Sequence, residues 1–110
     1  MPMFKFVTIY RKVDDEQALE NFFSGTNLPL AEQLPGLLRT EVSRISDKPG
    51  GQSRFHLMYE LYFESREAFT VALATEPGLA LMQALKQWDE ARIVTMFYAE
   101  SFAEEAPAQT

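Results

Sequence analysis

Residues 54–64 read Arg-Phe-His-Leu-Met-Tyr-Glu-Leu-Tyr-Phe-Glu. Successive side chains of a β-strand point to opposite faces. In this stretch one face is entirely apolar: Phe55, Leu57, Tyr59, Leu61 and Phe63. The other face is mixed: His56, Met58, Glu60, Tyr62 and Glu64. This alternation predicts an antiparallel strand that packs one face on a core and presents the other face to a different environment.

Three more predicted strands surround this one. Residues 37–46 precede it across the loop 47–51, Asp-Lys-Pro-Gly-Gly, whose composition predicts a hairpin. Residues 3–11 are β-branched and aromatic and contain no Gly or Pro, which predicts a strand buried on both faces or nearly so. Residues 91–102 form the last predicted strand.

The first helical region lies between residues 11 and 37. The acidic residues 14–16 suit the first turn of a helix, because they meet the positive end of its dipole, and a helix over 15–24 follows. Pro29 disfavours helical angles at the residue before it. We therefore expect a turn and then a short second helix over 29–34.

The second helical region follows the periodic strand. Ser65 is expected to cap a helix over 66–75. Residues 76–78, Glu-Pro-Gly, are expected to break that helix, and a second segment resumes over 79–89 with Trp88 on its buried side.

The element order is β-α-β-β-α-β, which predicts an α+β fold of the ferredoxin-like type. Its four-stranded antiparallel sheet has the strand order 4-1-3-2, counted along the chain, and the helices cover one face. We expect a single domain over residues 1–102 and a disordered tail over 103–110, where little can be buried.

The second face of this sheet carries Met58, Tyr62 and an apolar set from each of the first and last strands. A contiguous apolar patch of that size on one chain usually marks an interface. Two sheets packed face to face about a two-fold axis would cover it. The sequence therefore predicts a homodimer that forms an α+β barrel from two sheets.

Composition excludes several classes of function. The chain has 110 residues, no cysteine, one histidine and a net charge of −6, from 10 Lys+Arg against 16 Asp+Glu. Thiol chemistry and metal sites with two imidazoles are therefore excluded. The acidic balance argues against nucleic acid and anionic membranes as partners. We expect a cytoplasmic protein with no metal and no resident cofactor.

Two motifs resemble the EthD-like family, over about residues 3–102. Residues 6–12 read Phe-Val-Thr-Ile-Tyr-Arg-Lys, and residues 26–37 read Thr-Asn-Leu-Pro-Leu-Ala-Glu-Gln-Leu-Pro-Gly-Leu. Family members carry a Tyr-Arg pair at the end of the first strand, and His-x-Pro-Leu followed by Leu-Pro-Gly-Leu. Here Asn27 stands where the family usually has histidine, so proton transfer at that position is lost and only hydrogen bonding remains.

The resemblance implies a dimeric α+β barrel protein with an apolar cavity for a small organic compound, aromatic or carbonyl in character. A cofactor-free oxidoreductase and a non-catalytic binding or accessory protein are both open. Haem handling follows by fold analogy alone and would require His56 as axial ligand.

His56 is the candidate catalytic residue, because it is the only side chain that ordinarily titrates near neutral pH, and it is expected to share a strand face with Glu60 and Tyr62. The candidate substrate-binding residues are Tyr10, Asn27, Arg39, Tyr62 and Tyr98. Structural roles are the alternatives: a histidine at the rim of the sheet, an edge-strand charge at Arg39 and tyrosines that only fill the core or interface.

Overall fold

The structure is a computed structural model that describes residues 2–108. Its strands are β1 (Met3–Arg11), β2 (Arg39–Arg44), β3 (Asp47–Lys48), β4 (Gly51–Gln52), β5 (Phe55–Phe63) and β6 (Val94–Ser101). Its helices are α1 (Glu16–Phe22), the π-helical turn η1 (Phe23–Asn27), α2 (Leu28–Glu32), α3 (Arg66–Leu73) and α4 (Glu76–Glu90). The predicted β-α-β-β-α-β order and ferredoxin-like α+β class are confirmed.

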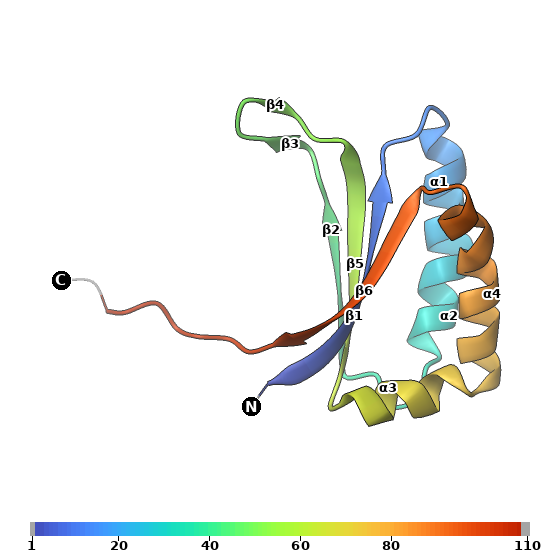
Figure 1. Cartoon of the computed structure of the whole chain (residues 1–110), viewed down its shortest axis with the longest axis vertical. Helices are drawn as coiled ribbons and strands as arrows, with labels where there is room; N and C mark the ends of the chain where they lie inside the picture. The colour runs from blue at the N-terminus through green and yellow to red at the C-terminus, as the bar shows by residue number, and fades with distance from the viewer. Residues whose placement is uncertain (1, 109–110) are drawn as a thin grey trace.

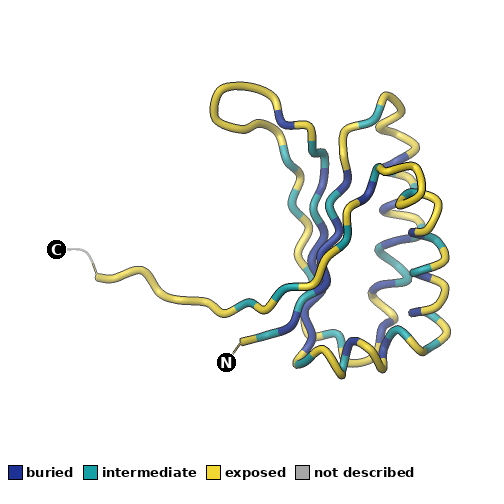
Figure 2. Tube along the Cα trace, in the orientation of Figure 1, coloured by how far each residue is buried: buried dark blue, intermediate teal, exposed yellow. Residues whose placement is uncertain are grey.

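The main sheet has the order β2-β5-β1-β6 and every pairing in it is antiparallel. This is the predicted order 4-1-3-2 read from the other edge. All the helices lie on one side of the sheet (Figure 1). Buried positions concentrate where the sheet and the helices face each other, as Figure 2 shows.

Strand register decides which side chains meet the helices. Phe4 lies opposite Phe63 and Phe6 opposite Leu61 on the helix side. The buried core on this side comprises Phe4, Phe6, Tyr10, Leu57, Tyr59, Leu61, Phe63 and Val94 from the strands, with Leu19, Phe23, Ala31, Phe69, Ala72, Leu81 and Leu85 from the helices. Leu57, Tyr59, Leu61 and Phe63 of the predicted apolar face therefore pack on the helices, whereas Phe55, at the start of β5, is half-buried and lies outside this core.

His56 departs from this alternation. The pairing of β1 with β5 shifts between Tyr10 and Arg11, so that Tyr10 lies opposite Leu57 and Arg11 opposite Phe55. This β-bulge leaves His56 as the extra residue on β5. Its ring nitrogen Nε2 lies 2.6 Å from Glu20 of α1, so the side chain is on the helix side. The expectation that His56 shares a face with Glu60 and Tyr62 is therefore wrong.

The first helical region is continuous where we expected a turn. Leu28, which precedes Pro29, has helical angles (φ −60°, ψ −51°), and its N–H bonds to the carbonyl of Phe23, five residues back. A proline ring ordinarily clashes with the carbonyl four residues before it. The wider π-helical turn moves that carbonyl away, so α1, η1 and α2 run on without a break.

Several boundaries differ from the prediction. β6 begins at Val94 and not at residue 91, because α4 runs to Glu90 and a turn follows it. β2 spans six residues, shorter than the predicted strand 37–46, because the chain beyond it opens into the small hairpin of β3 and β4. After β6, residues 102–108 have no regular structure and project away from the body on the side opposite the helices (Figure 1). Residues 109 and 110 of the predicted tail lie outside the described residues.

The helices α3 and α4 meet at a sharp bend of 85°. Ser65 caps α3 as predicted, since its hydroxyl accepts a hydrogen bond from the N–H of Ala68. The helix α4 begins at Glu76 and not at residue 79, because Thr75 caps it and Pro77 occupies the first turn, where its missing N–H is not needed. Within residues 2–108 no single helix has the length and apolarity to cross a membrane; only α3 and α4 counted together across their bend reach those limits.

Gly78 allows this bend. A Cβ atom at Gly78 would lie 2.3 Å from the carbonyl oxygen of Ala72 and 2.6 Å from Cα of Leu73. We expect Gly78→Ala to lower the free energy of unfolding by about 1–3 kcal/mol, because backbone has to move to make room. Chemical denaturation measures the change.

Gly25 in η1 is the matched control, since a Cβ there meets nothing within 4 Å. Gly25→Ala is expected to leave stability unchanged or to raise it by up to about 1 kcal/mol. Equal stability of Gly78→Ala and the unsubstituted protein would contradict the proposed close approach.

Candidate functional site

Tyr10 and Asn27 meet in the space between the sheet and the helices. Tyr10 ends the regular part of β1, and η1 presents Asn27 toward it, so that Asn27 Nδ2 donates a hydrogen bond to Tyr10 Oη. Tyr10 is 0% and Asn27 2% exposed. The two motif positions of the resemblance are therefore in direct contact. Phe22 and Phe23 pack edge-on against the ring of Tyr10 at 6.5 and 6.4 Å between centroids.

Two hydrogen-bond donors in this region have no partner within the described chain. They are the hydroxyl of Tyr59 and the indole Nε1 of Trp88, and both atoms are buried. Phe23 packs edge-on against Tyr59 at 5.0 Å, and Phe22 stacks on Trp88 at 4.9 Å. Most buried polar atoms in proteins are hydrogen-bonded, so two orphan donors on either side of the Phe22–Phe23 pair require an explanation.

The phenols of this cluster stay protonated at neutral pH. Burial raises the pKa of Tyr59 to about 12, although the nearby side chain of Thr40 opposes that shift. Burial also raises the pKa of Tyr10, although the hydrogen bond from Asn27 opposes that shift. Both groups therefore act as neutral hydroxyls, and Tyr59 can donate to a carbonyl, ether or quinone oxygen. We call Tyr10, Asn27, Tyr59, Phe23 and Trp88 the aromatic cluster.

His56 lies in a charged group at the edge of the same interlayer space. Its Nε2 is 2.6 Å from Glu20 and its Nδ1 is 3.3 Å from Glu16, both on α1. Arg44 of the edge strand β2 also binds Glu20, at 2.8 Å. Hydrogen bonds from Arg44 and then from His56 lower the pKa of the Glu20 carboxyl. Both ring nitrogens of His56 thus face carboxylates, which leaves neither free to serve as an axial haem ligand in this arrangement.

Arg39 and Tyr62 lie on the opposite face of the sheet. The hydroxyl of Tyr62 donates to Glu41 at 2.6 Å, and the Arg39 guanidinium lies over the Tyr62 ring, 4.5 Å from its centroid. The hydrogen bond to Glu41 raises the pKa of Tyr62. Lys5 and Glu60 form an ion pair of 2.5 Å beside them. The face that we expected to be almost wholly apolar is therefore divided between an ionic network and an apolar part.

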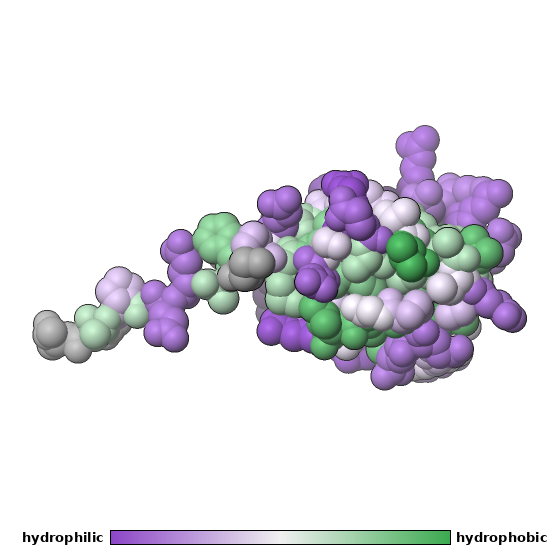
Figure 3. All heavy atoms as spheres, turned by 90° about the horizontal axis from the view of Figure 1, so that it is seen from below, coloured by the Kyte–Doolittle hydropathy of each residue, from purple (hydrophilic) through white to green (hydrophobic). Residues whose placement is uncertain are grey.

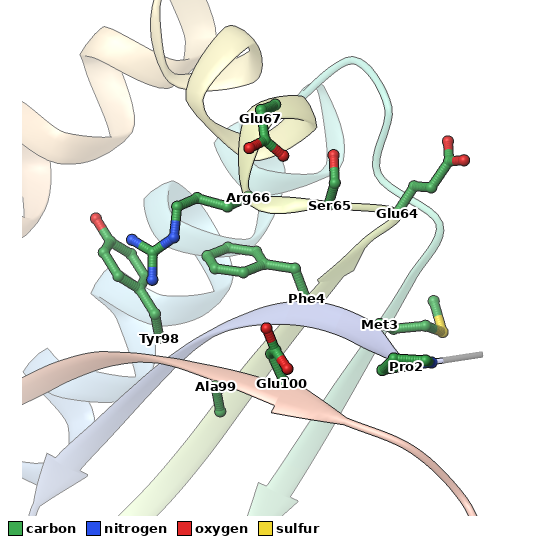
Figure 4. Close-up of a pocket in the computed structure, with 10 residues that line it drawn as sticks. All are labelled: Pro2, Met3, Phe4, Glu64, Ser65, Arg66, Glu67, Tyr98, Ala99 and Glu100. Carbon is green, nitrogen blue, oxygen red and sulfur yellow. The ribbon is translucent and has the colours of Figure 1, made fainter.

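Tyr98 lines a cavity of about 460 Å³ at the end of the sheet where α3 begins. Figure 4 shows Arg66 reaching between Phe4 and Tyr98, and its guanidinium carbon lies 5.3 and 5.0 Å from the two ring centroids. Glu64 and Glu100 border the same cavity. Seen from this end, pale and green residues occupy the middle of the surface and hydrophilic residues gather toward its margins (Figure 3).

The structure thus brings together two of the six predicted site residues, Tyr10 and Asn27. His56 lies near them on the helix side, Arg39 and Tyr62 share a network on the other face, and Tyr98 is at a third location. Tyr59 and Trp88 are not among the residues that the sequence predicts for the site. Tyr59, like the other three tyrosines, could line a pocket, but it lies on the strand face predicted to pack on the core, and the only signal for a site role is that a buried phenol needs a partner for its hydroxyl.

No group of three His, Asp or Glu side chains among the described residues is arranged to hold a metal ion. The donors present in the aromatic cluster are uncharged phenol, amide and indole groups. Such groups can orient an uncharged organic molecule through one or two hydrogen bonds within an apolar surround.

Solved structures of low sequence identity share this fold. SnoaB, a cofactor-independent oxygenase from Streptomyces nogalater, is 19% identical to this chain, with a TM-score of 0.63. The match covers 99% of this chain and 100% of SnoaB. A dimeric protein of unknown function with a ferredoxin-like fold, from Bacteroides fragilis, is 15% identical over 90% of this chain and 96% of its own, with a TM-score of 0.59. Both show likeness of fold.

Two other proteins are more similar in sequence. An uncharacterised 11.0 kDa protein from the thcB-thcC intergenic region of Rhodococcus erythropolis is 25% identical over 69% of this chain and 74% of its own length. An ethyl tert-butyl ether D (EthD) family protein of Bacillus halodurans is 30% identical over 91% of this chain and 99% of its own, with a TM-score of 0.84. No protein-family profile matches the chain. The identity and nearly complete coverage of the Bacillus protein show that this chain belongs to the EthD family.

Proposed function

We propose that the chain binds a small, uncharged aromatic compound with an oxygen acceptor, between η1 and the sheet. The buried hydroxyl of Tyr59 carries this proposal: Thr40 lies close enough to act on its pKa, but no group among the described residues forms a well-aligned hydrogen bond with it, and a ligand oxygen would supply that bond. Trp88 Nε1 offers a second donor on the other side of the Phe22–Phe23 pair. The flat walls formed by these rings suit an aromatic body.

Entry requires movement of η1, since Tyr10 and Tyr59 are 0% and 1% exposed. A π-helical turn is a local irregularity in a helix and is frequent at functional sites. Displacing η1 would carry Phe23 away from Tyr59 and open space at the phenols. The hydrogen bond between Asn27 and Tyr10 would then be exchanged for contacts with the ligand.

Two activities fit this site. In a cofactor-independent oxygenase, the activity named for SnoaB, neutral phenol donors would stabilise negative charge that develops on a substrate oxygen. In a binding or accessory protein, the same donors would only hold the ligand. A catalytic role for His56 stays a prediction, and its contacts with Glu16 and Glu20 give it a second role as a residue that positions α1. A cytoplasmic location likewise stays a prediction.

We also propose that the chain forms a homodimer through the open face of the sheet. Phe97 and Ala99 of β6 supply the exposed apolar part of this face, above the buried Val7 of β1, and Phe97 is 42% exposed. The dimeric Bacteroides fragilis protein has the same fold. Isologous packing of two such faces would remove this apolar surface from water.

Tyr59→Phe tests the ligand site. Without ligand, loss of the unpaired hydroxyl is expected to leave the free energy of unfolding unchanged or to raise it by about 1 kcal/mol. Acetophenone, in contrast, should bind about tenfold more weakly to the variant, because one hydrogen bond to its carbonyl is lost. Titration calorimetry with acetophenone, and with ethylbenzene as the analogue lacking oxygen, measures the effect.

Tyr62→Phe is the matched control, since it removes a phenol hydroxyl from the opposite face of the sheet. It should leave the affinity for acetophenone unchanged. Equal affinity of the Tyr59→Phe variant and the unsubstituted protein for acetophenone would contradict the proposed role of Tyr59.

Phe97→Glu tests the homodimer. A charge in the apolar part of the open face is expected to prevent association, so the sedimentation mass should fall from about twice 12.6 kDa to 12.6 kDa. Val71→Glu is the control, because Val71 is an exposed residue of α3 on the helix side. A mass of 12.6 kDa for the unsubstituted protein at micromolar concentration would refute the dimer.

Glu20→Gln tests the charged group that holds α1 over the site. The folded state lowers the pKa of Glu20 below its ordinary value of 4.5, so the stabilisation is present above that pH and is lost as the pH falls through the lowered pKa. We expect Glu20→Gln to reduce Tm most at neutral pH and progressively less below about pH 4. A reduction in Tm that is the same at every pH would assign the effect to packing instead of charge.

A further inference from the structure

A second cavity, of about 680 Å³, lies at the end of the sheet where β1 ends and β6 begins. Its described lining residues are Ile9, Arg11, Lys12, Arg54, Phe55, Arg92 and Thr95. Four of these seven are basic and none is acidic. This volume falls within the range of small-molecule sites, roughly 300–1,000 Å³. We call it the basic pocket.

The basic pocket holds four of the ten lysines and arginines of a chain whose net charge is −6. Within residues 2–108 none of the four forms an ion pair; the cations that do pair with carboxylates, at Lys5, Arg39, Arg44 and Lys86, lie elsewhere. All four are exposed, so water and salt screen part of their mutual repulsion, but no carboxylate of the described residues neutralises it. A bound anion would remove that repulsion.

Backbone hydrogen bonds hold the three segments of the basic pocket in place. The N–H of Arg11 bonds to the carbonyl of Ile93 at 2.9 Å, and the N–H of Lys12 to the carbonyl of Arg54 at 2.8 Å. The Arg11 guanidinium also donates to the carbonyl of Arg92, at 3.1 Å. The cations therefore stand on fixed backbone at the ends of strands, although their side chains are exposed, Lys12 Nζ donates to the carbonyl of Ser46 and the Arg54 guanidinium lies over the Phe55 ring, 5.0 Å from its centroid.

Arg92 adds an independent observation. Its φ is +61°, and it is the only non-glycine residue with positive φ among those described. It follows α4, where N–H groups of Arg92 and Ile93 close the helix end on Asp89 and Trp88. Glycine is the usual residue at such a position, because a side chain there is strained. An arginine kept in this conformation lines the basic pocket, and residues held in such backbone regions cluster at ligand sites.

We propose that the basic pocket binds a small organic dianion, either a dicarboxylate or a phosphate monoester, through Arg11, Arg54 and Arg92. Guanidinium groups match carboxylate and phosphate oxygens in pairs. The Phe55 ring and the Ile9 side chain give the pocket an apolar wall for the body of the ligand. This site is separate from the aromatic cluster on the helix side and does not rest on the function proposed for that cluster.

Titration calorimetry with phthalate and phenyl phosphate, and with benzamide as the uncharged analogue, tests the proposal. Both dianions should bind at least about tenfold more tightly than benzamide at low salt, and more weakly when salt is added. Arg92→Gly should weaken the binding of the dianions about tenfold while raising Tm by a few degrees, because the backbone strain is relieved. Comparison of phthalate with phenyl phosphate identifies which acid the pocket prefers.

Lys86→Gln is the control, since it removes one exposed positive charge from α4, outside the pocket. Equal weakening by Lys86→Gln and Arg92→Gly, or dianion binding no tighter than that of benzamide, would overturn the proposal. Sedimentation of each variant under the same conditions separates loss of binding from loss of the dimer.

Discussion

The pairing of β1 with β5 is the constraint on which the rest of the structure depends. Its register sets Phe4 against Phe63 and Phe6 against Leu61, and so puts large apolar side chains of both central strands on one face. The helices cover that face, because its apolar side chains have to be buried against another layer. The other face is left with Lys5, Glu60 and their neighbours. This register therefore determines on which side of the sheet each site lies.

The bulge in the same pairing shapes both the charged group at α1 and the basic pocket. The shift between Tyr10 and Arg11 brings His56 round to α1, where it meets Glu20. It also places Arg11 opposite Phe55, and both of these residues line the basic pocket. One extra residue in β5 therefore positions His56 in the charged group at α1 and also sets Arg11 against Phe55 in the basic pocket. A bulge is a common means of redirecting side chains near functional sites.

The sequence predicted the parts of the fold that follow from periodicity. Alternation over residues 54–64 indicated the buried face, and the placement of Gly, Pro and Ser indicated the element order and the cap at Ser65. The bulge could not be predicted, because a period of two carries no sign of an extra residue. The π-helical turn could not be predicted either, since the rule that proline disfavours helix at Leu28 assumes ordinary α-helical spacing. Tyr10 and Asn27 were found through a motif, whereas Tyr59 required knowledge of which hydroxyls lack partners.

The two proposed sites have one physical property in common, which distinguishes them from the core. Tyr59 keeps a buried hydroxyl with no partner, and Arg92 keeps a strained backbone beside other cations. Phenylalanine and glycine, respectively, would satisfy the fold better at these positions. By contrast, the cavity beside Tyr98 contains Arg66 stacked on two rings with carboxylates nearby, and so shows no comparable unmet interaction. Where a residue other than the observed one would make the fold more stable, a ligand is the simplest missing partner. The two sites lie on opposite sides of one sheet and differ in chemistry. The helix side offers uncharged donors, and the end of the open side offers cations.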